Sequence, residues 1–166
     1  QYIGGDGMAT LTAIATAWDS TDGITNPNNA LSNTADSTYS SMNGNYTRYL
    51  QGYDFGLIPG DAIVNSATIK IKAQSIGTTY PQFAMVNFYK NVDTWIGAFE
   101  FNQSYGLYTY QTTFTGFTVA EVKAGMRIRI DSYSGNEFNV YGEEIIIDYT
   151  PTFIYAAAKM KQWHGF

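Results

Sequence analysis

Apolar and polar residues alternate with a period of two along several stretches of the chain. The clearest run is 67–74, where Ile69 and Ile71 alternate with Lys70 and Lys72. Successive side chains of a strand point to opposite faces of a sheet, so this pattern predicts a strand with one buried face. Runs that we also predict to be strands are 9–18, 46–57, 82–89, 107–117, 126–131, 137–141 and 143–149. Residues 82–89 are apolar at both parities, which predicts a central strand covered on both faces.

Turn-forming residues such as Pro59-Gly60-Asp61 and Thr150-Pro151 separate these short runs. Short strands at even spacing with turn signals between them predict an all-β fold, an antiparallel, jelly-roll-like β-sandwich. At most one short helix is expected, over 118–124, where Thr118 and Glu121 have capping-box spacing and Gly125 follows. The residues predicted to face the core are Ala67, Ile69, Ile71, Met126, Ile128, Ile130, Ile145 and Ile147.

The last residues of the chain do not continue the strand pattern. We therefore predict a sandwich domain over residues 1–152 and a C-terminal extension over 153–166. Pro151 lacks the N–H that would continue a strand ladder. The extension carries large apolar side chains at Met160, Trp163 and Phe166. An exposed apolar segment of this kind marks an interaction site, so these three residues are predicted to contact a neighbouring protein.

Charge and cysteine content exclude several classes of function. Nine Lys and Arg residues against fourteen Asp and Glu give a net charge of −5, so no basic patch for nucleic acid is expected. The chain has no cysteine, which excludes disulfides and thiolate chemistry. No apolar run approaches the roughly 18 residues that a membrane-spanning helix needs, so no membrane partner is expected.

Catalytic constellations are weak, and we predict that the protein is not an enzyme. The single histidine, His164, is the third residue from the end of the sequence, a position poorly suited to the packing that a catalytic triad needs. Glu143 and Glu144 are adjacent, so on a strand they point to opposite faces. Asp93 and Glu100 flank Trp95 and leave a polysaccharide-active enzyme open as a weaker alternative.

The segment 19–41 is long, polar and rich in hard oxygen donors. Asp19, Asp22 and Asp36 are candidate ligands of a calcium ion, which prefers carboxylate and amide oxygens. The alternative is that Asp and Asn occur there because they form turns. No other cofactor is expected.

Aromatic residues make up 16% of the chain. Trp18, Trp95 and Tyr39 are candidates for a platform on which sugar rings stack, because an aromatic face suits the apolar face of a pyranose. Core packing and subunit interfaces also use aromatic residues and remain alternatives.

An ordered series of segments resembles a known family. It comprises Trp18, NTADSTY at 33–39, YDFGLIPGDAI at 53–63, ATIKI at 67–71 and EIIIDYT at 144–150. It is similar to a β-sandwich module of virion structural proteins from tailed bacteriophages and prophages. The turn at 58–63 reads IPGDAI, where that module has IPSGATI.

The resemblance implies a non-enzymatic structural component of a bacteriophage particle: a capsid decoration, a head fibre or a tail appendage. Its implied partners are other virion proteins and further copies of itself, and its implied location is the particle surface or otherwise outside the cell. The family carries no catalytic residues to transfer. The alternative is a carbohydrate-binding jelly-roll module that attaches to a host or to a polysaccharide, with a surface glycan as partner.

Overall fold

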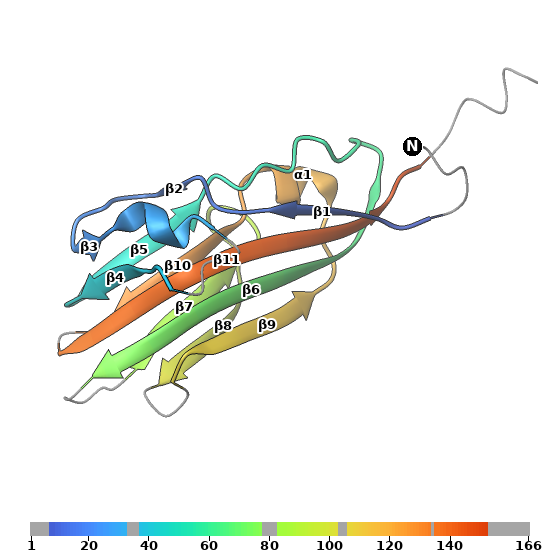
Figure 1. Ribbon diagram of the computed structural model, residues 1–166. Coiled ribbons are helices and arrows are strands. Elements are labelled where there is room, and N and C mark those ends of the chain that lie inside the picture. Colours follow the sequence, from blue (N-terminus) through green and yellow to red (C-terminus); the bar gives the residue numbers. More distant parts are fainter. Residues whose placement is uncertain (1–6, 33–36, 78–82, 103–105, 134, 153–166) are drawn as a thin grey trace, which may run out of the picture.

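The computed structural model describes residues 7–32, 37–77, 83–102, 106–133 and 135–152, which form two antiparallel sheets packed face to face (Figure 1). Sheet A has the order β3 (Ile24–Thr25), β4 (Ser40–Asn43), β11 (Asn136–Thr150), β6 (Ile63–Gly77) and β9 (Tyr108–Phe114), and β1 (Ala9–Ala13) also pairs with β11. Sheet B has the order β2 (Ala17–Trp18), β5 (Tyr46–Gln51), β10 (Arg127–Ser132), β7 (Phe83–Tyr89) and β8 (Trp95–Asn102).

The strands from β4 to β11 are connected as a jelly roll. The order β4-β11-β6-β9 in one sheet faces β5-β10-β7-β8 in the other, and every strand pair within the sheets is antiparallel. This arrangement of two interleaved Greek keys is that of a jelly-roll sandwich. The predicted fold class, an all-β antiparallel sandwich, is confirmed.

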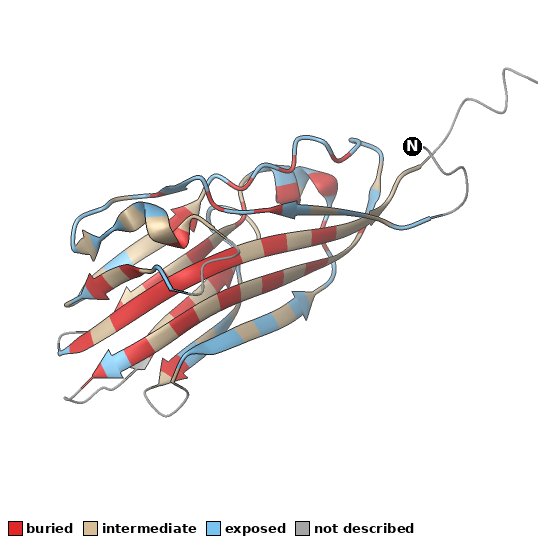
Figure 2. Cartoon of the chain, viewed as in Figure 1, coloured by how far each residue is buried: buried red, intermediate tan, exposed pale blue. Residues whose placement is uncertain are grey.

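The core lies between the sheets and follows the period-two pattern (Figure 2). All eight residues predicted to face inward are 0% exposed. In β11 and β6 they face each other in register, with Ile145 opposite Ile69 and Ile147 opposite Ala67. The alternation of apolar residues with Lys and Arg therefore identified the buried faces of β6 and β10 correctly.

The predicted helix is present as α1 (Val119–Lys123). The Thr118 hydroxyl accepts the Glu121 N–H at 3.2 Å, and a Glu121 carboxylate oxygen accepts the Thr118 N–H at 2.9 Å. This reciprocal capping box satisfies two backbone donors that have no partner within the helix. Gly125 follows with a φ of +113°. The described residues include one further helical turn, the 3-10 helix η1 (Pro27–Ala30).

Some strand predictions need correction. The run 9–18 forms two strands, β1 and β2, and the runs 137–141 and 143–149 form the single strand β11. Strand β7 is buried on one face only: Val86 and Phe88 are 0% exposed, whereas Met85 and Tyr89 on the other face are partly exposed. Among the described residues, no further strand or helix packs on that side of sheet B, so Met85 and Tyr89 remain partly exposed. The run predicted over 46–57 ends as strand β5 at Gln51, because Gly52 adopts a φ of +79° that breaks the extended backbone.

Glu143 and Glu144 point to opposite faces of β11, as predicted. Glu144 forms a 2.9 Å ion pair with Lys70 on the outer face of sheet A. Glu143 points into the sandwich and is 2% exposed. Its Oε1 accepts the Ala15 N–H at 2.7 Å. A carboxyl group is therefore buried on the same face of β11 as Ile145 and Ile147.

The C-terminal extension 153–166, with Met160, Trp163 and Phe166, lies outside the described residues, as does Asp36. The sandwich strands extend to Thr150. None of the helices in the described residues is long and apolar enough to cross a bilayer.

Candidate functional site on the outer face of sheet B

The outward surface of sheet B, here called the outer face of sheet B, gathers aromatic and charged side chains from neighbouring strands. Strand β10 places Ile128 and Ile130 in the core and therefore turns Arg127, Arg129 and Asp131 outward. The strand register sets Tyr49 of β5 and Asn87 of β7 on either side of Arg129. It also sets Tyr89 between Arg127 and Trp95 of β8.

Arg127 lies between two tyrosine rings. Its guanidinium carbon is 4.2 Å from the centroid of the Tyr49 ring and 5.5 Å from that of Tyr89. The two rings meet edge-on at 6.1 Å. The Arg127 Nη2 group donates to the Val92 carbonyl oxygen. Cation–π contacts and this hydrogen bond hold the side chain against the sheet, so the rings form a rigid surface.

Arg129 and Asp131 form the polar centre of the face. Arg129 Nη2 is 2.9 Å from Asp131 Oδ1, and Nη1 donates to the Tyr89 hydroxyl at 3.4 Å. The hydrogen bond with Asp131 raises the pKa of the Arg129 guanidinium above its usual range. Asp131 also accepts hydrogen bonds from Thr47 Oγ1 at 2.6 Å and from Asn87 Nδ2 at 3.0 Å. Both charges are thus fixed and compensate each other.

Trp95 is the large exposed aromatic side chain of the face. It is 56% exposed, and its indole Nε1 donates to Asn87 Oδ1 at 3.2 Å. Trp95 pairs with Tyr89 in the strand register, and Asn87 lies two residues away on the same face. The hydrogen bond therefore draws the indole along the sheet instead of letting it project into solvent. This leaves an orientated ring beside hydrogen-bonding groups.

A shallow groove of about 360 Å³ adjoins Arg129 and Asp131 at the end of sheet B near the β4–β5 turn. Its lining residues are mostly polar: Asn45, Tyr46, Thr47, Arg129, Asp131, Ser132 and Tyr133. The outer face of sheet B thus combines aromatic rings with fixed donors and acceptors, which suits a ligand that has both apolar and hydroxyl-bearing surface.

The structure does not bring the three candidate platform residues together. Trp18 is 7% exposed and its indole donates to the Pro27 carbonyl oxygen at 2.8 Å, so it belongs to the core and cannot offer a face to a sugar. Trp18 and Trp95 lie in the opposite edge strands of sheet B, about 19 Å apart at the usual strand spacing. Tyr39 precedes β4 of sheet A, where its ring lies 5.0 Å from that of Tyr141.

Of the described candidate calcium ligands, Asp19 is engaged through its carboxylate and Asp22 through its backbone carbonyl oxygen. Asp19 Oδ1 accepts the Tyr49 N–H at 2.8 Å, which ties the segment after β2 to β5. The Asp22 carbonyl oxygen accepts hydrogen bonds from Arg48 at 2.9 and 2.7 Å. Among the described residues, no group of three or more acidic, histidine or cysteine side chains could hold a metal ion.

Sequence reasoning singled out Trp95 but not Tyr49, Tyr89, Arg127, Arg129 or Asp131. The alternation in 126–131 did show that Arg127, Arg129 and Asp131 face solvent. That tyrosines from β5 and β7 flank them depends on which strands are neighbours in sheet B, and these strands are distant in the sequence. An outward Arg-x-Arg-x-Asp on a predicted strand was the available signal.

No protein-family model matches this chain, and no curated protein matches it. Among solved structures it is similar to the CBM22-1 xylan-binding domain of Xyn10C from Paenibacillus barcinonensis, with 9% identity, a TM-score of 0.47, and coverage of 82% of this chain and 92% of that one. It is also similar to a carbohydrate-binding module of lichenase 5A from Cellvibrio mixtus, solved with cellotriose (12% identity, TM-score 0.42, 86% and 97% covered). The coat protein of tobacco streak virus gives 8% identity, a TM-score of 0.38 and 92% coverage of both chains.

At these identities the likeness is one of fold alone. The chain has the β-sandwich fold that the resemblance to phage virion modules implied, and no sequence match supports a virion role.

Proposed function

We propose that the protein is a non-catalytic module that binds carbohydrate on the outer face of sheet B, outside the cell. The observation that carries this proposal is Trp95, which is 56% exposed and held along the sheet by its hydrogen bond to Asn87. A sugar ring has an apolar face that stacks on an indole and hydroxyl groups that need fixed partners. Arg129, Asp131 and Asn87 supply such partners beside the ring.

The charge balance of the face favours a neutral saccharide. Arg129 is paired with Asp131, and Arg127 is held between tyrosine rings. An acidic polysaccharide would have to compete with Asp131 for Arg129, since the two already share a hydrogen bond of 3.0 Å between Nε and Oδ1. A neutral sugar hydroxyl can accept from the arginine or donate to the carboxylate without separating the pair.

A glycan array probed with the whole chain tests the proposal. We expect the wild-type protein to bind neutral saccharides and the Trp95→Ala variant to bind them about tenfold more weakly, since a ring contact contributes about 1.5 kcal/mol. Leu57→Ala is the matched control, because Leu57 is 81% exposed and lies outside sheet B. Absence of binding to every glycan, or equal binding by the Trp95→Ala variant, would contradict the proposal.

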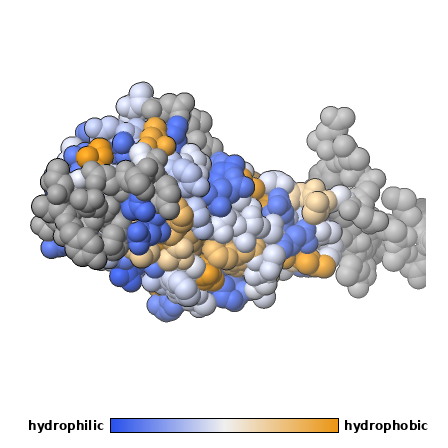
Figure 3. All heavy atoms as spheres, turned by 90° about the horizontal axis from the view of Figure 1, so that it is seen from below, coloured by the Kyte–Doolittle hydropathy of each residue, from blue (hydrophilic) through white to orange (hydrophobic). Residues whose placement is uncertain are grey.

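A second candidate function is the structural role in a phage particle, acting through contacts with further copies of this chain. The observation that favours it is at the edge formed by β8 and β9, where Leu107 and Tyr108 are 44% and 41% exposed. Figure 3 views the molecule from below and shows hydrophobic residues among hydrophilic ones on this side. Light scattering tests this function: self-association that Tyr108→Asp abolishes and Leu57→Asp preserves supports it, and a monomeric wild-type protein contradicts it.

A further inference from the structure

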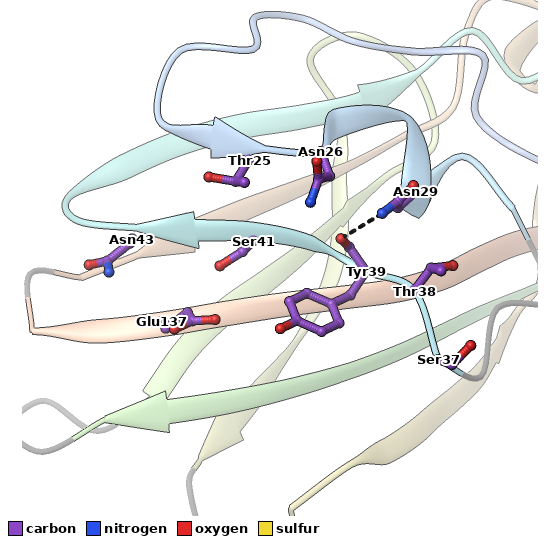
Figure 4. Close-up of a pocket in the computed structure, with 9 residues that line it drawn as sticks. All are labelled: Thr25, Asn26, Asn29, Ser37, Thr38, Tyr39, Ser41, Asn43 and Glu137. Carbon is purple, nitrogen blue, oxygen red and sulfur yellow. Dashed lines mark hydrogen bonds between the residues drawn. The ribbon is translucent and has the colours of Figure 1, made fainter.

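A second polar groove lies on the outward surface of sheet A, near its β3–β4 edge (Figure 4). Its volume is about 540 Å³, larger than that of the groove on sheet B. We call it the β3–β4 groove. Its lining residues are Thr25, Asn26, Asn29, Ser37, Thr38, Tyr39, Ser41, Asn43 and Glu137. Thr25, Ser41 and Glu137 follow the outward parity of their strands, so the groove opens away from the core.

The turn that forms one wall of the groove is anchored from below. The buried Ser40 hydroxyl lies 2.8 Å from the Asn26 carbonyl oxygen and accepts the Ala30 N–H at 2.9 Å. The buried Trp18 indole donates to the Pro27 carbonyl oxygen. Asn26 is the one non-glycine residue of the described chain with a positive φ, +53°. These contacts tie the turn to the strands beneath it, and a wall that is already held in place lowers the ordering cost of binding.

Tyr39 forms the aromatic part of the groove. Its carbonyl oxygen accepts a hydrogen bond from Asn29 Nδ2 at 3.1 Å, which joins the segment before β4 to the helical turn η1 (Figure 4). Its ring meets the ring of Tyr141 at 5.0 Å with the planes tilted by 47°. Tyr141 is only 9% exposed, so it supports the Tyr39 ring from the sheet and leaves Tyr39 as the ring that lines the groove.

The chemistry of the lining defines the ligand. Apart from the ring, the described lining residues offer amide and hydroxyl groups and one carboxylate, that of Glu137. Among the described residues that line it there is no lysine or arginine, which disfavours a phosphate, a sulfate or an acidic sugar. Amides and hydroxyls both donate and accept, as the hydroxyl groups of a neutral saccharide require.

We infer that the β3–β4 groove is a second site for a neutral saccharide, so that one molecule binds two glycan chains at once. This inference rests on the proposed function. The two sites lie on the outward surfaces of opposite sheets and therefore face away from each other (Figure 1). A single short oligosaccharide cannot contact both, whereas two polysaccharide chains can be joined through the module. Joining two weak sites in one molecule raises the apparent affinity for a polymer.

The inference is tested by titration calorimetry of the full chain with a neutral oligosaccharide that the protein binds on the glycan array. We expect two sites per wild-type chain, and one site each for Trp95→Ala and Tyr39→Ala. Asn43→Lys serves as a second groove variant, because Asn43 is exposed and a lysine there blocks the groove without disturbing the core. Leu57→Ala is expected to retain both sites. Turbidity of a soluble polysaccharide with the wild-type protein should be lost in each single-site variant.

A stoichiometry of one that Trp95→Ala abolishes and Asn43→Lys leaves unchanged would overturn the second site and leave the proposed function standing. A stoichiometry of one that Asn43→Lys abolishes and Trp95→Ala leaves unchanged would place the only site in the groove, against both the bivalent inference and the site proposed on sheet B. Failure to bind any oligosaccharide would remove both.

Discussion

The Tyr53 hydroxyl donates a hydrogen bond of 2.6 Å to Glu143 Oε2 inside the sandwich. Tyr53 is 7% exposed and lies in the loop that follows β5 of sheet B, whereas Glu143 belongs to β11 of sheet A. The hydrogen bond therefore joins this loop to the opposite sheet. Burial raises the pKa of Glu143 to about 7, although the hydrogen bonds from Tyr53 and Ala15 oppose this shift. Burial, followed by the proximity of Glu143, also raises the pKa of Tyr53 well above its usual value.

The raised pKa of Glu143 makes stability depend on pH. The folded protein keeps the proton up to a pH of about 7, whereas the unfolded chain releases it near 4.5. The free energy of unfolding is therefore expected to fall between about pH 4.5 and pH 7, by up to about 3 kcal/mol. Urea unfolding of Glu143→Gln should lack this slope. Glu144→Gln, on the outer face, should keep it, and a slope that persists in Glu143→Gln would show that another group titrates.

Core packing between the sheets is tested by Ile128→Ala. Ile128 is 0% exposed and lies in the middle strand of sheet B. Its truncation is expected to lower the free energy of unfolding by about 2–5 kcal/mol through lost burial and the remaining cavity. Leu57→Ala, at an exposed position, should change it by less than about 0.5 kcal/mol. Equal effects of the two variants in denaturant titrations would contradict the assigned core.

The role predicted for the C-terminal extension is tested by deleting the chain after Tyr155. The last strand ends at Thr150, and Thr152 Oγ1 donates to the Asp61 carbonyl oxygen at 2.6 Å, ahead of the cut. We expect the truncated protein to remain folded by circular dichroism and to lose self-association in light scattering. Unchanged assembly, or unfolding, would show that 153–166 belongs to the domain itself.

Calcium is tested by melting curves in added calcium and in chelator. Asp19 already accepts the Tyr49 N–H, and Asp and Asn residues are frequent in turns without any metal. We therefore expect the same melting temperature in both conditions. A rise with calcium and a fall with chelator would instead support Asp19, Asp22 and Asp36 as ligands, because a metal that binds only the folded state stabilises it.

Most of the longer strands could be predicted from the sequence, whereas strand β8 could not. Strand β8 has the sequence WIGAFEFN, which is apolar at both parities and contains a glycine, so no pattern marked it. An added Cβ at Gly97 would lie 3.0 Å from the Phe114 ring of the other sheet, so the ring would have to shift by a few tenths of an ångström. That contact joins residues from different sheets and is invisible in a local pattern.

The candidate site could be predicted only in part, for a related reason. Trp95 was singled out by residue type, but its grouping with Tyr89 and Arg127 depends on strand pairing across sheet B. Trp18 has the same residue type, yet its indole is held under the turn at Pro27. Residue type alone does not separate a ring that anchors a loop from one that faces solvent.

The most direct test of carbohydrate binding follows the indole N–H resonance of Trp95 by NMR while a neutral oligosaccharide from the array is added. The resonance is assigned by its absence in Trp95→Phe. Because Nε1 donates to Asn87 beside the proposed binding surface, we predict that this signal shifts in a saturable manner. A Trp95 signal that stays unchanged while the protein binds the sugar, or the absence of any binding, would contradict the proposed site.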